Sequence, residues 1–412
     1  MLDAALLALG PGLLAPTLGA VELGSGARIE LRAGSAPVTS GQPSVPTVAL
    51  DLRGFSTAVF SSDRHTLTLR YFPRFFVRHP NDLDLTRPLF LHAGDLHHEY
   101  RAAPTLTWKN DVRASVGEVD YSSSELALAS GRANPLDVAV IQFAEVEGAT
   151  GLHHAFDEKT SGSATLLLGY NTPYDQIEST ADDGTITIPY PAHAQAVLAL
   201  EASHKSSEKT TLSLPAFVRY DGFSNDSEFA AASLSLAITH LHGALTRSEL
   251  RGGAMVVKRL DTPGDDVSVF PRALAEIFTR SASSETHRFE HHAGLALEPY
   301  LDPVRAEYRL LGGVELGSLL ELYPRWSAGI ELAGSTSVSR HPLVPPELET
   351  YLEARTPFRY RLGDHSFFEF GTRWRARGPH LGDPPFELTD FELWGYAAFG
   401  CTLGNLSPTA LY

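Results

Sequence analysis

Apolar and polar side chains alternate along most of this chain, and residues 65–78 show the pattern most clearly. One phase carries Leu67, Leu69, Tyr71, Phe75 and Val77, and the other carries Thr66, Thr68, Arg70, Arg74 and Arg78. Successive side chains of a β-strand point to opposite faces, so the segment predicts a strand with one apolar and one arginine-bearing face. It is also longer than the roughly five or six residues that are usual for strands of soluble proteins.

The same alternation predicts further strands along the chain. It is clear at 47–53, 89–101, 106–116, 304–316, 325–332, 355–377 and 391–403, and weaker at 28–32, 138–156, 161–171, 194–204, 209–221, 228–242 and 248–259. Asn110 interrupts the apolar phase of its segment. Residues 171–191 are rich in Asp, Thr and Pro and predict an exposed loop, in which 185–188 can form a hairpin. We expect about 16–18 antiparallel strands, an even number as in bacterial barrels.

Two further regularities agree with a membrane barrel. Connections alternate between tight segments at 61–64, 102–104, 205–208 and 362–365 and long ones at 79–87, 123–137, 171–192 and 379–389. Outer-membrane barrels join their strands by short periplasmic turns and longer external loops. Aromatic residues also recur on the apolar phase, as an interfacial girdle requires. These residues are Tyr71, Trp108, Tyr308, Trp326, Tyr360 and Trp374.

Composition narrows the class of protein. The chain has 412 residues, 43% of them apolar, but no run approaches the roughly 18 apolar residues of a membrane helix. We expect one barrel domain at 21–412, because no linker interrupts the pattern. The formal charge of −16 argues against a nucleic-acid partner, and the single cysteine, Cys401, allows no internal disulfide. Residues 1–20 resemble the apolar core and cleavage end of a secretory signal, although they lack its basic start.

A soluble antiparallel sandwich would show the same alternation, but the placement of arginine favours a membrane barrel. An arginine that faces lipid at mid-bilayer costs about 2–4 kcal/mol, so a barrel must keep its arginines on one phase. Arg70 and Arg74 share one phase, as do Arg373 and Arg375. We therefore expect an all-β fold, an antiparallel transmembrane β-barrel that crosses the membrane with strands alone.

With these features the chain resembles the outer-membrane β-barrel proteins of Gram-negative bacteria, in the broad porin-like sense. Segments such as Thr66 to Tyr71 and Val116 to Tyr121 carry the resemblance, which has no diagnostic motif. It implies a pore for passive transport of small solutes in the bacterial outer membrane. The implied partners are outer-membrane lipid, lipopolysaccharide and the barrel-assembly machinery, and the oligomeric state stays open. Members commonly end in an aromatic residue; this chain ends in Tyr412, but residues 405–408 separate it from the last predicted strand.

Closure of the barrel would bring arginines from both ends of the chain onto one wall of the lumen. The candidate solute-binding residues are Arg53, Arg70, Arg74, Arg78, Arg355, Arg359, Arg373, Arg375 and Arg377, with Arg361 on the same wall. Guanidinium groups fork onto carboxylates and phosphates, so the wall would favour small anions. Alternatively, these arginines pair with Asp51, Glu353, Glu369 and Glu392 and hold the wall rigid. Such pairing, or loops folded inward, would suit a plugged barrel with a structural or surface-interaction role.

Catalysis and metal binding are not predicted. The histidine doublets at 97–98, 153–154 and 291–292 cannot chelate by themselves, because adjacent side chains of a strand point to opposite faces. The chain has no G-x-S-x-G elbow, and no spacing of Ser, His and Asp singles out a triad. An enzyme at the barrel rim would need such groups to converge on one external patch. A passive pore needs no cofactor.

Overall fold

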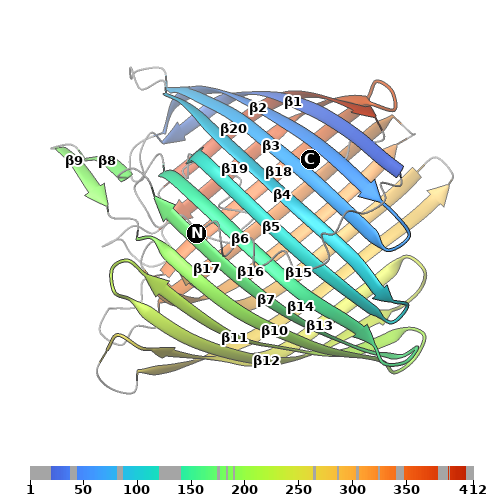
Figure 1. Ribbon diagram of the computed structural model, residues 1–412. Helices are drawn as coiled ribbons and strands as arrows, with labels where there is room; N and C mark the ends of the chain where they lie inside the picture. The colour runs from blue at the N-terminus through green and yellow to red at the C-terminus, as the bar shows by residue number, and fades with distance from the viewer. Residues whose placement is uncertain are drawn as a thin grey trace.

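A computed structural model describes residues 20–37, 44–80, 87–119, 141–173, 177–181, 184–188, 191–262, 266–284, 287–302, 306–322, 325–339, 348–378, 388 and 390–404 (Figure 1). The first strands are β1 (Ala20–Pro37), β2 (Ser44–Ser61), β3 (His65–Pro80), β4 (Arg87–Ala103), β5 (Leu106–Val119), β6 (Ile141–Ala155) and β7 (Thr160–Pro173). A short pair follows, β8 (Ile177–Ala181) and β9 (Gly184–Ile188). The next strands are β10 (His193–Lys205), β11 (Thr210–Phe223), β12 (Glu228–Leu241), β13 (Thr246–Arg259), β14 (Val267–Ser284) and β15 (His287–Asp302). The last are β16 (Glu307–Leu322), β17 (Trp326–Ser339), β18 (Leu348–Arg361), β19 (Ser366–Gly378) and β20 (Asp390–Gly404). None of the described segments is a helix long and apolar enough to cross a membrane.

The long strands form one 18-stranded antiparallel sheet that closes on itself. Closure joins β1 to β20, with Gly24 opposite Gly404 and Ser35 opposite Leu393. β7 pairs directly with β10, because β8 and β9 form a separate two-stranded hairpin beside the barrel (Figure 1). The structure thus confirms the antiparallel barrel and its even strand number. The predicted signal segment, 1–20, lies outside the described residues except for Ala20.

The two ends of the barrel differ in their connections. At the end where β1 begins and β20 ends, successive strands are joined by short segments such as 104–105 and 206–209. At the opposite end, the strand bounds leave longer segments, including 120–140 and 379–389. The four tight connections expected from the sequence fall at the short-turn end, and the strands that flank the four expected long connections end at the opposite side. Most residues of those long connections, including all of 123–137, lie outside the described ranges. Following the rule for outer-membrane barrels, we label the short-turn end periplasmic and the long-loop end external.

The two faces of the wall differ in polarity. On β12 the burial pattern alternates over residues 228–238, with Ser233 and Ser235 buried on the inner face and Leu234 and Leu236 exposed on the outer face. The exposed outer side chains around the barrel are mainly Leu, Val, Ile and Phe. Strands of 13 to 18 residues are long enough for this apolar belt to span a bilayer. The alternation predicted from the sequence therefore separates side chains that face the lumen from side chains that face outward.

One seam interrupts the wall at the external end. β13 and β14 pair from Val267 onward, but β14 and β15 pair only from Ala273, opposite Leu297. Two positions beyond this pair, Pro271 on β14 and Pro299 on β15 would face each other. The ladder between β13 and β14 continues through Pro271, and the ladder between β15 and β16 continues through Pro299. The N–H groups that the prolines lack are therefore missing from the edges of β14 and β15 that face each other. The prolines explain why the ladder ends there.

Beyond this seam the β15–β16 hairpin lies inside the barrel. Consecutive residues Tyr308, Arg309 and Leu310 are all buried, so both faces of the hairpin are covered. Its apolar face packs against the inner face of β11 to β14. This packed group, called here the seam cluster, comprises Phe223, Phe229, Ala231, Met255, Val257, Phe270, Leu301, Ala306, Tyr308 and Leu310. The wall overlaps itself like a scroll, and the expectation that Tyr308 belongs to an interfacial girdle is wrong.

Candidate functional site: an arginine–carboxylate network on the inner wall

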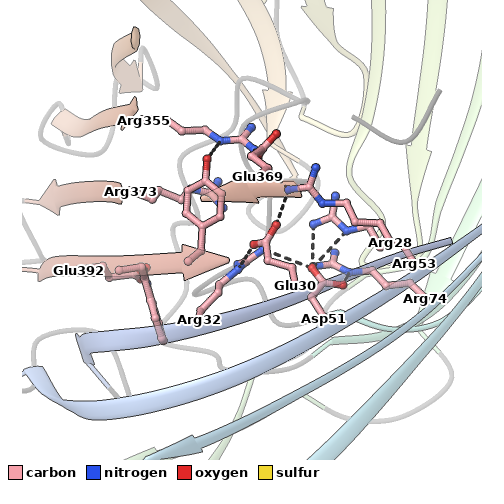
Figure 2. A network of polar contacts seen from close by, with 12 residues as sticks. Arg28, Glu30, Arg32, Asp51, Arg53, Arg74, Arg355, Glu369, Arg373 and Glu392 are labelled. Atoms are coloured by element: carbon pink, nitrogen blue, oxygen red, sulfur yellow. Dashed lines mark hydrogen bonds and ion pairs between the residues drawn. The ribbon is translucent and has the colours of Figure 1, made fainter. Parts of the chain in front are cut away.

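A row of arginines lies on the inner wall beside the closure. Arg28 on β1, Arg53 on β2 and Arg74 on β3 are register partners across these adjacent strands. Two residues further toward the external end, Glu30 and Asp51 are partners on β1 and β2. The period of two in a strand puts all five residues on one face, and Figure 2 shows their side chains converging.

Asp51 is the centre of the first group, and it is fully buried. Its carboxylate accepts hydrogen bonds from Arg53 at 2.7 Å and from Arg74 at 2.6 and 2.9 Å. Arg32 donates to the same carboxylate at 3.2 Å. Glu30, also buried, accepts from Arg32 at 2.5 Å and from Arg28 at 2.6 Å. Each carboxylate therefore holds at least two guanidinium groups.

Glu369 on β19 links this group to the other end of the chain. Its buried carboxylate accepts from Arg28 at 3.0 Å, from Arg355 at 3.1 Å and from Arg359 at 3.1 Å. Arg28 reaches it from β1 across β20, where Ala398 lies between Glu30 and Glu369 in the register. The small alanine side chain leaves the guanidinium a path over β20. The contact thereby crosses the closure of the barrel.

A third group surrounds Glu353 on β18. Arg373 and Arg375, two residues apart on β19, both donate to Glu353 at 2.9 Å. Tyr351 donates to the same carboxylate at 2.5 Å. Arg375 also lies 3.7 Å from Glu392 on β20. Charge-assisted bonds of this kind are short and direct, so the side chains are held in fixed positions.

The three groups form one interior network with more arginines than carboxylates. It contains eight arginines, Arg28, Arg32, Arg53, Arg74, Arg355, Arg359, Arg373 and Arg375, and five carboxylates, Glu30, Asp51, Glu353, Glu369 and Glu392. Glu331 lies 3.9 Å from Arg355 and adds a sixth carboxylate, so the excess is two positive charges. Among the described residues, the buried Arg28 Nε and Arg375 Nη2 have no hydrogen-bond partner. Both nitrogens are buried, so they do not face the lumen.

The structure brings six of the nine predicted arginines into this network. They are Arg53, Arg74, Arg355, Arg359, Arg373 and Arg375. Arg78 is buried on the inner face of β3, whereas Arg70 is half-exposed and pairs with Asp95 at 2.7 Å. Arg361 lies 3.6 Å from Glu321. Arg377 belongs to β19, but its side chain lies outside the described part.

Three members of the network were not predicted as site residues. Arg28, Glu30 and Arg32 lie on β1, which the sequence indicated only as a short strand at 28–32. The alternation of charged residues with Ile29 and Leu31 was the available signal. All four carboxylates that the sequence offered as pairing partners contact arginines; they are Asp51, Glu353, Glu369 and Glu392. Glu30 is a further carboxylate of the network that the sequence analysis did not name as a pairing partner.

A second polar centre lies at the external end of the lumen, beside the seam cluster. Asp221 on β11 is fully buried and accepts from Arg219 at 2.7 Å. His193 on β10 lies 2.8 Å away. Tyr308 on the inward hairpin donates to the same carboxylate at 2.7 Å, although β16 and β11 are five strands apart in the sheet. This hydrogen bond ties the hairpin to the opposite layer of the wall.

The interruption of the apolar phase at Asn110 is also explained. Asn110 faces outward but is buried, and its Oδ1 accepts from Trp108 at 3.0 Å and from Thr150 at 2.8 Å. Its Nδ2 lies 3.3 Å from Nδ1 of His98, which in turn contacts His65 at 3.2 Å. A polar side chain on the lipid side is tolerated here because its hydrogen bonds are made within the wall.

Replacing Asn110 by alanine should therefore destabilise the barrel. The substitution leaves His98 Nδ1 without its donor and Trp108 with one acceptor instead of two, at an expected cost of about 1–3 kcal/mol. The midpoint of guanidinium unfolding in detergent micelles, followed by tryptophan fluorescence, measures the effect. An unchanged midpoint would show that the network contributes nothing to stability.

The histidine doublet at 97–98 splits as alternation requires. His97 points inward and contacts Asp111 at 2.6 Å, whereas His98 points outward to Asn110. In the described ranges, no three His, Cys, Asp or Glu residues gather in a way that could hold a metal ion. The prediction that the doublet is not a chelating pair is consistent with these contacts.

The closed register, the outward apolar belt and the charged inner wall together define a class of fold: the protein is a closed, 18-stranded transmembrane β-barrel of the kind that bacterial outer membranes contain. No family model matches the chain, and no curated protein matches it. Solved structures of similar shape include OpdL of Pseudomonas aeruginosa (11% identity, 94% of this chain and 99% of that chain covered, TM-score 0.45). A BenF-like porin from Pseudomonas fluorescens Pf-5 has 7% identity, coverage of 94% and 100%, and a TM-score of 0.46. OccAB4 of Acinetobacter baumannii has 9% identity, coverage of 94% and 99%, and a TM-score of 0.43.

Proposed function

We propose that this protein is a passive pore for small solutes and that its inner wall favours anions. The observation that carries the proposal is the partial exposure of arginines whose carboxylate partners are fully buried. The side chains of Arg53 and Arg355 are 26% and 27% exposed, while those of Asp51 and Glu369 are 0% exposed. Solutes beside Asp51 and Glu369 therefore meet guanidinium groups before these two carboxylates. Guanidinium groups facing water keep donors available for carboxylates and phosphates.

The ion pairs between the inner-wall arginines and their carboxylates make the wall rigid, and they also support this proposal. Buried ion pairs of good geometry fix their side chains, so the lumen-facing arginines stand in constant positions. The excess of two positive charges in the network remains after all these pairs, including that of Arg355 with Glu331, are formed. The wall can be rigid and anion-attracting at once, so the two alternatives raised by the sequence are compatible.

Planar-bilayer conductance with a salt gradient tests the proposal. We expect stable current steps and a reversal potential that indicates anion preference. Arg74→Gln should reduce the anion-to-cation permeability ratio about two- to fivefold, because a nearby unit charge is worth about 0.5–1 kcal/mol to an ion in water. Glu331→Gln should raise the ratio, since this half-exposed inner-wall carboxylate lies 3.9 Å from Arg355.

Lys159→Gln serves as the matched control for loss of one positive charge. Lys159 lies in the exposed turn 156–159 at the short-turn end, away from the network. Its replacement should leave the permeability ratio nearly unchanged. Equal effects of Arg74→Gln and Lys159→Gln would contradict a role of the network in selectivity. Insertion without conductance would instead favour the closed barrel with a structural or surface-interaction role, which the inward hairpin also suits.

A further inference from the structure

An aromatic pair marks the depth of the membrane interface at the short-turn end. Trp326, the first residue of β17, lies opposite Tyr360, the penultimate residue of β18, and their ring centroids are 4.3 Å apart. Tryptophan and tyrosine rings on the outer face of a barrel lie at the level of the lipid headgroups. Residues at the equivalent positions of other strand pairs should therefore lie at the same level.

Between β7 and β12, threonine and histidine occupy these equivalent positions. Thr160, the first residue of β7, lies opposite His204, the penultimate residue of β10. Thr210, the first residue of β11, lies opposite His240, the penultimate residue of β12. Each histidine continues the outward phase of its strand, which carries exposed aliphatic side chains toward the middle of the barrel wall. The two histidines therefore lie where headgroups meet the apolar belt.

The two histidine rings are held in the same way. Oγ1 of Thr160 lies 3.1 Å from Nδ1 of His204, and Oγ1 of Thr210 lies 2.9 Å from Nδ1 of His240. In neither ring does Nε2 form a hydrogen bond with another described residue. A neutral ring that accepts the threonine proton at Nδ1 donates from Nε2, and a charged ring donates there as well. The threonines thus orient two donors that suit the oxygens of a phosphate group.

Lysines are concentrated beside these histidines. Three of the five lysines of the chain lie in or beside the turns that follow β6 and β10; they are Lys159, Lys205 and Lys209. The backbone N–H of Lys205 donates to the carbonyl of Lys159 at 2.8 Å, so the two turns are direct neighbours. Likewise, the N–H of Leu241, next to His240, donates to the carbonyl of Lys209 at 2.8 Å. Exposed lysines at a membrane border can lay their stems on apolar surface and keep the amine among the headgroups.

The histidines decide the sign of this patch. Its three lysines are matched in number by the carboxylates of the same turns, Asp157, Glu158 and Glu208. The residues opposite the two histidines on the following strands, Leu212 and Ser248, are uncharged. A third histidine, His242, has its ring centroid 4.7 Å from that of His240. Histidine ordinarily becomes charged as the pH falls from about 8 to 5, so the patch changes from nearly neutral to positive over this range.

We propose that His204, His240, Lys205 and Lys209 bind the phosphate of an anionic phospholipid, whose acyl chains lie against the outward side chains of β10 to β12. The headgroup meets oriented donors and positive charge, and the chains meet exposed leucines. The occupant is a lipid because the donors adjoin the apolar belt, where phosphate and acyl chains are present together. This site does not depend on whether the barrel conducts.

Native mass spectrometry of the full chain in detergent micelles tests the site. The probes are phosphatidylglycerol, which is anionic, and phosphatidylcholine, which has no net charge. In mild acid, phosphatidylglycerol should bind more than about tenfold more tightly, and Lys205→Gln and Lys209→Gln should each weaken its binding about fivefold, the usual contribution of one basic side chain at an anionic surface. Equal affinity for the two lipids would overturn the proposal.

Arg325→Gln is the matched control for loss of one positive charge. Arg325 is an exposed turn residue at the same end of the barrel, but it adjoins Trp326 in the aromatic sector. Its replacement should leave the affinity for phosphatidylglycerol unchanged. A loss as large as that of Lys205→Gln would show attraction by overall charge and overturn a defined site. Heat-dependent gel mobility checks that each variant forms the barrel.

The double variant His204→Gln, His240→Gln tests the part that the histidines play. Glutamine keeps a donor but cannot become charged, so the gain in affinity as the pH falls from about 8 to 5 should disappear. An unchanged gain would overturn the assignment of the histidines. Glycerol phosphate serves as a headgroup without acyl chains. Displacement of the lipid by an equal concentration of glycerol phosphate would show a site for free phosphate, and this outcome would overturn the lipid as its occupant.

Discussion

Glu369→Ala should be among the most destabilising single substitutions in this barrel, at about 3–5 kcal/mol. The substitution leaves Arg28, Arg355 and Arg359 without the buried carboxylate that all three share. Removing one partner of a buried ion pair costs more than the pair contributes, because the remaining charge stays desolvated. The contact between Arg28 and Glu369 also spans the closing strand β20. Guanidinium unfolding of the refolded protein in micelles measures the loss, with heat-dependent gel mobility confirming that the barrel forms.

Glu331→Ala is the control for this prediction. Glu331 lies on β17 and approaches the same Arg355, at 3.9 Å, but its side chain is 54% exposed. Exposed pairs contribute about 0–1 kcal/mol, so its loss should shift the unfolding midpoint little. Equal shifts for the two variants would mean that the burial of Glu369 is not what makes it important. Glu369→Gln, which keeps an acceptor oxygen but no charge, should fall between them.

The strands that the sequence predicted best are those with one lipid face and one water or ion-pair face. β3 and β19 follow the rule, because a lipid-facing arginine is costly and the sequence must keep to one phase. The class of fold followed from this constraint. The pairing partners followed as well, because Asp51 and Glu369 lie on the same phases as their arginines.

β14 and β15 were not predicted as strands, although they span 267–284 and 287–302. Their patterns are broken by prolines at 271 and 299 and by the polar run near His291 and His292. These features are local, and the sheet overrides them because its neighbours supply the ladder on the other side. Alternation also continues into Tyr308, but it carries no information on whether the apolar face meets lipid or a second layer of the wall. That depends on where the ladder between β14 and β15 ends.

The closing ladder offers a second large effect, at Gly34. On the inner face of β1, a Cβ at this position would overlap the backbone carbonyl of Leu393 on β20. A backbone atom of a paired strand cannot move aside cheaply, so Gly34→Ala should break the ladder near Ser35 and Leu393, where closure ends. We expect a loss of about 1–3 kcal/mol, as for overpacked interiors, and slower refolding into micelles. Gly395→Ala tests the same ladder from its other strand, where an added Cβ meets only Ala33 O at 3.8 Å, an ordinary contact. The contrast between these two alanines isolates the close approach of β1 to β20, and equal stability of both variants would show that the closing strands have room to separate.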